Sequence, residues 1–193
     1  MRKIVHGNKN FGFATIDFSG TTPVFDTPVM LPGMVSSTIE VEQSDDSIFA
    51  DNIVWARPRG AKVRTAEAAF RYITEDYMEL LGFKKATNGL FTDTGTARPH
   101  AFFFEETVED SDTGEVTQTL HIIYNATGSE PTVETTTDED GVEAREISVS
   151  YTCSDSTFVE DGDGKAVQYA FITRNTENAT LYDTFTTAIL IPA

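Results

Sequence analysis

Cysteine is almost absent from this sequence of 193 residues, which contains only Cys153. A single cysteine excludes an intrachain disulfide and any metal site that needs several thiolates. The three histidines, His6, His100 and His121, are scattered and form no metal-binding motif. The patterns of zinc proteases, phosphate-binding loops and serine hydrolases are missing as well. We therefore expect no catalytic residue, no metal and no cofactor.

Three short motifs resemble parts of active or metal sites without meeting their requirements. Asp93-Thr94-Gly95 and Asp112-Thr113-Gly114 both match the aspartic protease signature, but they lie too close together for an enzyme of two lobes. Asp161-Gly162-Asp163-Gly164 alternates carboxylates with glycines, as Ca²⁺ sites do, but the loop pattern with its terminal Glu is missing. We interpret the acidic motifs as solvated turns, with a weak ion site at Asp161–Gly164 as the alternative.

Long hydrophobic runs are missing too. No segment approaches the length needed to cross a bilayer. The N-terminal residues Met1–Asn8 include two basic residues but no apolar core like that of a signal peptide. We expect a soluble chain that is made in a cytoplasm and does not contact a membrane.

Positive charge is scarce, with 14 lysines and arginines against 31 acids and a net charge of −17. The imbalance is local, because residues 105–163 hold 17 acids and one base, Arg145. Sequence-independent binding of duplex DNA needs a basic face, and only the stretch Arg57–Arg71 is basic. Most of the chain is therefore expected to repel polyanions.

Short segments of alternating polar and apolar residues, separated by Gly and Asp turns, predict a mainly-β fold, a β-sandwich or barrel. One short flanking α-helix is expected at residues 75–82, with Thr74 as N-cap and Gly82 just beyond its end. We expect a single domain over residues 1–193, with an N-terminal arm at 1–12 and a C-terminal arm at 175–193. The expected strands are Phe13–Phe18, Val35–Gln43, Ala61–Ala66, Pro99–Glu106, Thr117–Asn125, Arg145–Cys153 and Val167–Arg174.

Two of these strands, Val35–Gln43 and Ala61–Ala66, are expected to pair in an antiparallel manner. Pairing of Glu42 with Lys62 and of Glu40 with Arg64 would place opposite charges across from each other on one face. The same register would place Val41 opposite Val63 on the other face.

The loop between these strands, residues 44–60, is much longer than a hairpin turn requires. It holds five apolar residues and two arginines: Ile48, Phe49, Ile53, Val54, Trp55, Arg57 and Arg59. A disordered linker would lack such apolar and aromatic residues. One interpretation is a loop that folds back over its own core. We favour the other, an arm that buries these side chains against another copy of the protein. The apolar C-terminal residues Ile189, Leu190 and Ile191 are candidates for the same role.

Several segments in order resemble the major tail protein, or tail tube protein, family of long non-contractile-tailed bacteriophages of Gram-positive bacteria. The resemblance runs from about Thr27 to Arg174 and depends on Thr27–Gly33, Ile48–Asn52, the Asp76–Gly82 helix, Pro99–Phe104, Leu120–Thr127, Glu130-Pro131 and Glu146–Thr152. The acidic segment Thr132–Glu143 and the bases Lys62 and Arg64 depart from the family's pattern.

The resemblance implies a structural virion protein without enzymatic activity. It implies a β-sandwich with a flanking helix, six copies in a ring, and rings stacked into a tail tube through which genomic DNA passes without specific binding. It also implies assembly in the host cytoplasm and partners such as the tape measure, tail terminator and distal tail proteins. Strand positions Glu40, Glu42, Lys62 and Arg64 become candidates to face the channel. The alternative is a monomeric β-sandwich module that binds carbohydrate or a cell surface through Phe49 and Trp55.

Overall fold

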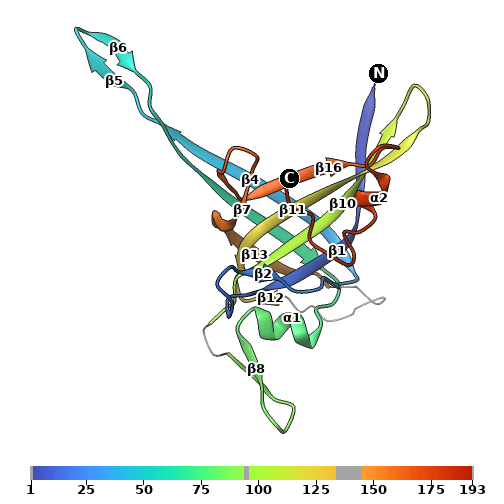
Figure 1. The fold of residues 1–193 in the computed structure, drawn as a ribbon. Helices are drawn as coiled ribbons and strands as arrows, with labels where there is room; N and C mark the ends of the chain where they lie inside the picture. The colour runs from blue at the N-terminus through green and yellow to red at the C-terminus, as the bar shows by residue number, and fades with distance from the viewer. Residues whose placement is uncertain (1, 94–95, 134–144, 193) are drawn as a thin grey trace, which may run out of the picture.

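One large antiparallel β-sheet forms the body of the protein in this computed structural model, which describes residues 2–93, 96–133 and 145–192 (Figure 1). The mainly-β prediction is confirmed. The strands of this sheet are β1 (Lys3–Asp17), β2 (Val24–Phe25), β3 (Val29–Met30), β4 (Met34–Asp45), β7 (Arg59–Phe70), β10 (His100–Asp110), β11 (Val116–Gly128), β12 (Thr132–Val133), β13 (Ile147–Cys153) and β16 (Tyr169–Thr173).

The strand order is β4–β7–β13–β11–β10–β1–β2, and the sheet divides at β11. Residues Thr119–Ile123 of β11 pair with β16, whereas Ala126–Gly128 pair with β13. Strand β10 occupies the other edge of β11. Strands β16 and β13 therefore pair with the same edge of β11, at successive positions along it. This division lets the sheet curve around one core while β10 and β11 also carry a second core on their other face.

The continuous apolar runs of β10 and β11 serve both cores. Phe102, Phe104 and Ile123 face the first core, whereas Phe103 and Ile122 face the second. Because successive side chains of a strand point to opposite faces, a strand that is covered on both sides needs apolar residues at every position. The second core is covered by β14 (Ser156–Glu160), which pairs with β15 (Ala166–Val167), by α2 (Ala179–Tyr182), and by the residues that follow α2.

The helix expected at residues 75–82 is α1 (Glu75–Leu80), which closes one end of the first core. The Thr74 hydroxyl accepts a hydrogen bond from the Tyr77 backbone N–H, as an N-cap residue does. Gly82 follows the helix with φ of 104°, a conformation that favours glycine. The second helix, α2, was not predicted. None of the described helices is long and apolar enough to cross a membrane.

The N-terminal segment is part of the sheet and not a free arm, which corrects the expectation for residues 1–12. From Lys3 onward the chain pairs with β10, Lys3 opposite Asp110 and Lys9 opposite Glu105. The pairing shifts at bulges near Gly7 and Asn10, and most side chains before Phe11 are exposed, so no alternation marks this strand in the sequence. Phe11 itself is buried in the first core.

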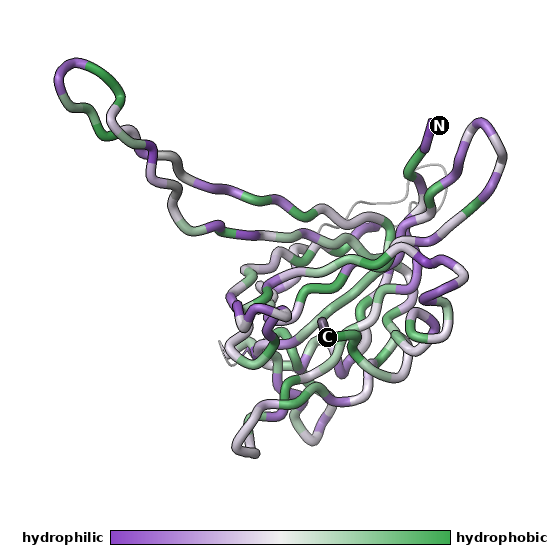
Figure 2. Tube along the Cα trace, turned by 45° about the horizontal axis from the view of Figure 1, so that its top comes forward, coloured by the Kyte–Doolittle hydropathy of each residue, from purple (hydrophilic) through white to green (hydrophobic). Residues whose placement is uncertain are grey.

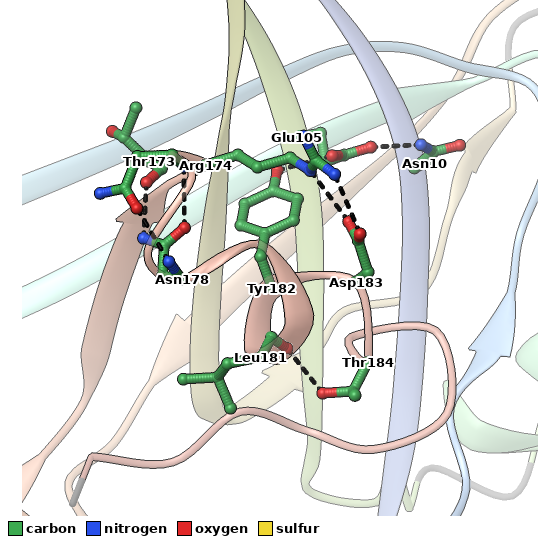
Figure 3. Close-up of polar contacts among 10 residues, drawn as sticks. Asn10, Glu105, Thr173, Arg174, Asn178, Leu181, Tyr182, Asp183 and Thr184 are labelled. Carbon is green, nitrogen blue, oxygen red and sulfur yellow. Dashed lines mark hydrogen bonds and ion pairs between the residues drawn. The ribbon is translucent and has the colours of Figure 1, made fainter.

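The C-terminal segment also differs from the expected arm, because it packs on its own sheet. Tyr182 and Phe185 are buried in the second core, and the Tyr124 hydroxyl donates a 2.8 Å hydrogen bond to the carbonyl of Leu190. Figure 3 shows the Tyr182 hydroxyl donating to the Glu105 carboxylate at 2.6 Å, beside a bidentate pair between Arg174 and Asp183.

In the described part of the chain, two hairpins that are separate from the large sheet project from the body. One lies between β4 and β7 and consists of β5 (Ile48–Ala50) and β6 (Ile53–Ala56). It reaches far from the body in both views (Figures 1 and 2). The other, β8 (Phe83–Lys85) with β9 (Phe91–Asp93), lies beyond α1. Residues 94–95 of the first protease-like motif, and most of the acidic segment Thr132–Glu143, lie outside the described residues.

Candidate assembly surfaces

The hairpin of residues 44–60, which we call the arm, exposes large apolar side chains. Trp55 is 70% exposed, Phe49 67%, Ile53 61%, Ile48 51% and Val54 40%. The loop therefore does not fold back over its own core, and that interpretation was wrong. Figure 2 shows the hydrophobic residues of the arm at a distance from the body.

The backbone of the arm explains its shape. Asp51 and Asn52 both have positive φ, 53° and 62°, which is the conformation of a tight hairpin turn and suits Asp and Asn. In β6, Ile53 and Trp55 point to one face and Val54 to the other, so both faces of the hairpin are apolar. An isolated two-stranded hairpin is marginally stable in water. Exposed apolar groups in such number are typical of an interaction surface.

The arm carries charges of both signs. Arg57 is exposed after β6, and Arg59 is the first residue of β7, opposite Asp45. Residues 44–60 hold the acids Asp45, Asp46 and Asp51 against these two bases, so the arm as a whole is not basic.

The register of β4 and β7 differs by one residue from the expected one. Glu40 lies opposite Thr65 and Glu42 opposite Val63, whereas Val41 lies opposite Arg64 and Gln43 opposite Lys62. The expected pairs of Glu42 with Lys62 and of Glu40 with Arg64 were therefore wrong. The two acids lie on one face of the strand pair, and the two bases lie on the other face.

Burial decides this register. Ala66, Ala68 and Phe70 of β7 all face the first core, and Ile39 of β4 packs against the same core directly opposite Ala66. Cross-strand charge pairs contribute only about 0.2–1 kcal/mol each. Burying an apolar side chain contributes about 1.5–3 kcal/mol, so the apolar face prevails.

Arg64 is held inside the protomer. Its guanidinium lies 4.7 Å from the centre of the Tyr169 ring, and Nη1 donates a 3.2 Å hydrogen bond to the Gln168 side chain. His121 lies nearby, between the Tyr169 hydroxyl at 2.7 Å and the Glu106 carboxylate at 3.0 Å. Arg64 is thus part of a polar cluster between β7, β11 and β16, away from Glu40 and Glu42.

The opposite face of β4, β7 and β13 is exposed, hydroxylated and anionic. It contains a shallow depression of about 570 Å³, and the residues that line it include no base. Glu67 pairs with Thr38 on one side and with Ser150 on the other, so carboxylate and hydroxyl groups alternate across the strands. We call this surface the hydroxyl face; it is formed by Thr38, Glu40, Glu42, Thr65, Glu67, Ser150 and Thr152.

Glu40 and Glu42 were predicted from the sequence as candidates for a functional surface, but the other members of the hydroxyl face were not. The alternation of small polar residues in Ile147–Cys153 was a signal for them. Only the strand order brings β13 beside β7, and this order is not visible in the sequence.

The C-terminal candidates separate in the structure. Leu190 is buried in the second core, Ile189 is half-buried against it, and Ile191 is 61% exposed. Only Ile191 presents most of its side chain to the outside.

The acidic turn at Asp161–Gly164 is held by its own backbone. The Asp161 carboxylate accepts hydrogen bonds from the backbone N–H groups of Asp163 and Lys165, both at 2.9 Å. These bonds stabilise the charged form, and the pKa of Asp161 is lowered, with the Lys165 amide as the largest cause. No group of three His, Cys, Asp or Glu side chains in the described ranges is arranged to hold a metal ion.

The side chain of His100 is buried, and its surroundings favour the neutral imidazole. Its Nδ1–H donates to the Arg98 carbonyl at 3.0 Å, and Nε2 lies 3.4 Å from the Tyr77 hydroxyl, which contacts the Tyr151 hydroxyl at 2.6 Å. Desolvation lowers the pKa of His100 to about 4. This chain of hydrogen bonds lies inside the first core and is accounted for by packing.

A family model described as phage tail tube protein matches the chain over residues 1–193. No curated protein matches.

Proposed function

The chain belongs to the phage tail tube protein family, and from this premise we propose that it is a structural protein of the virion tail whose copies assemble into stacked hexameric rings. The genomic DNA would pass through the resulting tube. The tape measure, tail terminator and distal tail proteins would be its partners, and assembly would take place in the host cytoplasm without a membrane or a cofactor.

The exposed arm is the observation that carries this function. It projects Ile48, Phe49, Ile53, Val54 and Trp55 into solvent and is too thin to shield them itself. Trp and Arg are the residues most enriched at the centres of interfaces, and the arm holds Trp55 beside Arg57 and Arg59. A second copy that covers these side chains removes them from water.

The sheet supplies a second support for self-assembly. In the described part of the chain, no strand pairs with the outer edge of β4, which is 12 residues long. An unpaired edge presents backbone N–H and C=O groups to another strand. In a closed ring, such an edge is satisfied by the next copy.

We propose that the hydroxyl face lines the channel. Glu40, Glu42 and Glu67 give it negative charge, and its hydroxyl groups offer no cation to phosphates. Repulsion acts over about a Debye length, ~8–10 Å, so DNA slides past without adhering. We do not assign this role to Lys62 and Arg64, the other two candidates for the channel, because they lie on the other face of the strand pair.

Electron microscopy tests the function directly. We expect the purified protein at high concentration to form rings or tubes in negative stain and to sediment as large species. Monodisperse particles of protomer size that bind glycans on an array would instead establish the alternative, a monomeric carbohydrate- or surface-binding module. The aromatic side chains of the arm serve either function, so particle size decides between them.

A further inference from the structure

Resting on the self-assembly proposed above, we infer that Arg64 is a positioning residue that fixes the direction in which the arm leaves the body. The arm is carried by a two-stranded ribbon, which consists of residues 42–43 of β4 and residues 61–63 of β7 and which we call the stem. Arg64 follows the stem in the sequence and lies where the stem joins the body.

The stem has no strand beside it other than its own two. Strand β13 pairs with β7 from Phe70 to Arg64, with Cys153 opposite Arg64, and its pairing ends there. Among the described residues, 59–63 of β7 pair with β4 alone, and the side chains of 61–63 are exposed (Figure 1). Two-stranded ribbons twist more than wider sheets and are marginally stable in water. The direction of the stem therefore depends on the last contact that its base makes with the body.

Arg64 makes this contact, and it does so with β16. No backbone ladder joins β7 to β16 within the described ranges. The Arg64 guanidinium spans the interval instead, 4.7 Å from the centre of the Tyr169 ring, while Nη1 donates a 3.2 Å hydrogen bond to Oε1 of Gln168. The hydrogen bonds of a planar guanidinium have fixed directions. This contact therefore constrains the angle between the stem and β16, and not only their separation.

Tyr169 is a rigid anchor for Arg64. A carboxylate only accepts hydrogen bonds, so the His121 Nε2–H donates to Glu106 at 3.0 Å, and in the neutral ring Nδ1 then accepts from the Tyr169 hydroxyl at 2.7 Å. The His121 ring also stacks on Phe104, with ring centres 5.1 Å apart, and Phe104 belongs to the first core. The position of the Tyr169 ring is thus set by the body and not by the arm.

Stability of the protomer does not account for an arginine at this position. The Nε atom of Arg64 is buried and has no hydrogen-bond partner among the described residues. A buried donor without a partner costs about as much free energy as a typical hydrogen bond contributes. An apolar side chain of similar length would avoid this cost, but it would lack the directed contact with Gln168 and Tyr169.

The length of the arm amplifies small changes at its base. Trp55 lies nine positions before Arg64, which is about 30 Å along an extended strand. A change of about 15° in the direction of the stem, within the ordinary spread of strand twist, moves Trp55 by about 8 Å. Apolar side chains touch only when their atoms approach within about 4.5 Å. Loss of the Arg64 contact is therefore enough to misplace the apolar side chains of the arm.

Distances between two spin labels on the protomer test this role by pulsed electron paramagnetic resonance. One label is attached through Trp55→Cys in the arm, and the other through Leu181→Cys in α2, where Leu181 is 58% exposed. The native Cys153 is buried, and desolvation raises the pKa of its thiol to about 11, so the label reacts with the introduced cysteines. We expect one narrow distance distribution when Arg64 is present.

Variants of the contact should change this distribution without unfolding the protomer. We expect Arg64→Met to widen or shift it by about 8 Å, while the urea midpoint of unfolding stays close to that of the unmodified protein. Tyr169→Leu removes the anchor from the other side and should have the same effect. Because both substitutions break one contact, the double variant should show no wider a distribution than either single variant. Lys62→Met, an exposed base of the stem, is the matched control and should change nothing.

Two outcomes would overturn the inference. One is a distance distribution of Arg64→Met that superimposes on that of the unmodified protein. The other is a lowered urea midpoint with an unchanged distribution, which would show that Arg64 only stabilises the fold. Both are measured on the protomer and do not depend on tubes. Failure of the unmodified protein to form tubes would instead refute the proposed function, and the measured distances would stand.

Discussion

Replacing Trp55 with alanine separates assembly from folding. A tryptophan side chain offers roughly 200 Å² of surface, and 70% of Trp55 is exposed in the protomer. Burying about 140 Å² in a neighbour at about 25 cal/mol per Å² stabilises the contact by up to about 3.5 kcal/mol. Interface residues of this kind cost about 2–4 kcal/mol on truncation. At tenfold for each 1.4 kcal/mol, about 2–3.5 kcal/mol corresponds to a critical concentration for assembly of Trp55→Ala that is raised about 30- to 300-fold.

The same substitution should leave the protomer nearly unchanged. Because most of Trp55 lies in water, its removal breaks few contacts within the chain. Surface substitutions of this kind change the free energy of unfolding by about 0.5 kcal/mol or less. Leu90→Ala, at the tip of the other hairpin, is the matched control and should change neither quantity.

Two assays measure the two effects separately. Sedimentation velocity over a concentration series gives the critical concentration, and urea unfolding at concentrations where the protein is monomeric gives the free energy of unfolding. A Trp55→Ala protomer that is destabilised by more than about 2 kcal/mol yet assembles normally would refute an interface role for Trp55. Such a protein would use Trp55 as a core residue.

The elements that could be predicted from the sequence are those determined by residues close together in the chain. The helix α1 follows from the Thr74 cap and Gly82, and both behave as expected. The arm follows from composition, since Phe49 and Trp55 have no place in a disordered linker, and their exposure agrees with an arm that awaits a partner. Each of these inferences needed only a short stretch of sequence.

The register of β4 and β7 shows why the remaining features could not be predicted. In the sequence, the charges of Glu42 and Lys62 are visible, but the core that receives Ala66 and Phe70 is built from distant strands. The larger contribution, from burial of apolar side chains, was therefore not visible in the sequence. The smaller contribution, from cross-strand charge pairs, led to a predicted register that was wrong by one residue.

The chain ends show the same limit. Tyr182 donates its hydrogen bond to Glu105, which lies 77 positions earlier in the chain. Neither residue carries a local signal of this partner, so the apolar C-terminal segment was expected to be an arm. The structure instead uses part of its apolar surface for its own second core and leaves Ile191 exposed.

Two further predictions concern the stability of the protomer. Burial holds the pKa of His100 at about 4, below about 6.5 in the unfolded chain. Between these values the unfolded state binds a proton that the folded state does not, so stability is lost as the pH falls. At pH 5 this difference in proton binding at His100 lowers the free energy of unfolding by about 2 kcal/mol. Urea unfolding at pH 7 and pH 5 should show a smaller pH-dependent loss in His100→Gln than in the unmodified protein, and equal losses would exclude His100 as the source. Tyr182→Phe should cost about 1.5–3 kcal/mol at pH 7, because the buried Glu105 carboxylate, which is 3% exposed, loses the hydroxyl donor. Tyr72→Phe is its control, since Tyr72 is 60% exposed and the substitution should have almost no effect. If Tyr182→Phe unfolds at the same urea concentration as the unmodified protein, the bond to Glu105 does not hold the C-terminal segment on the sheet, and burial of Tyr182, Phe185 and Leu190 alone must do so.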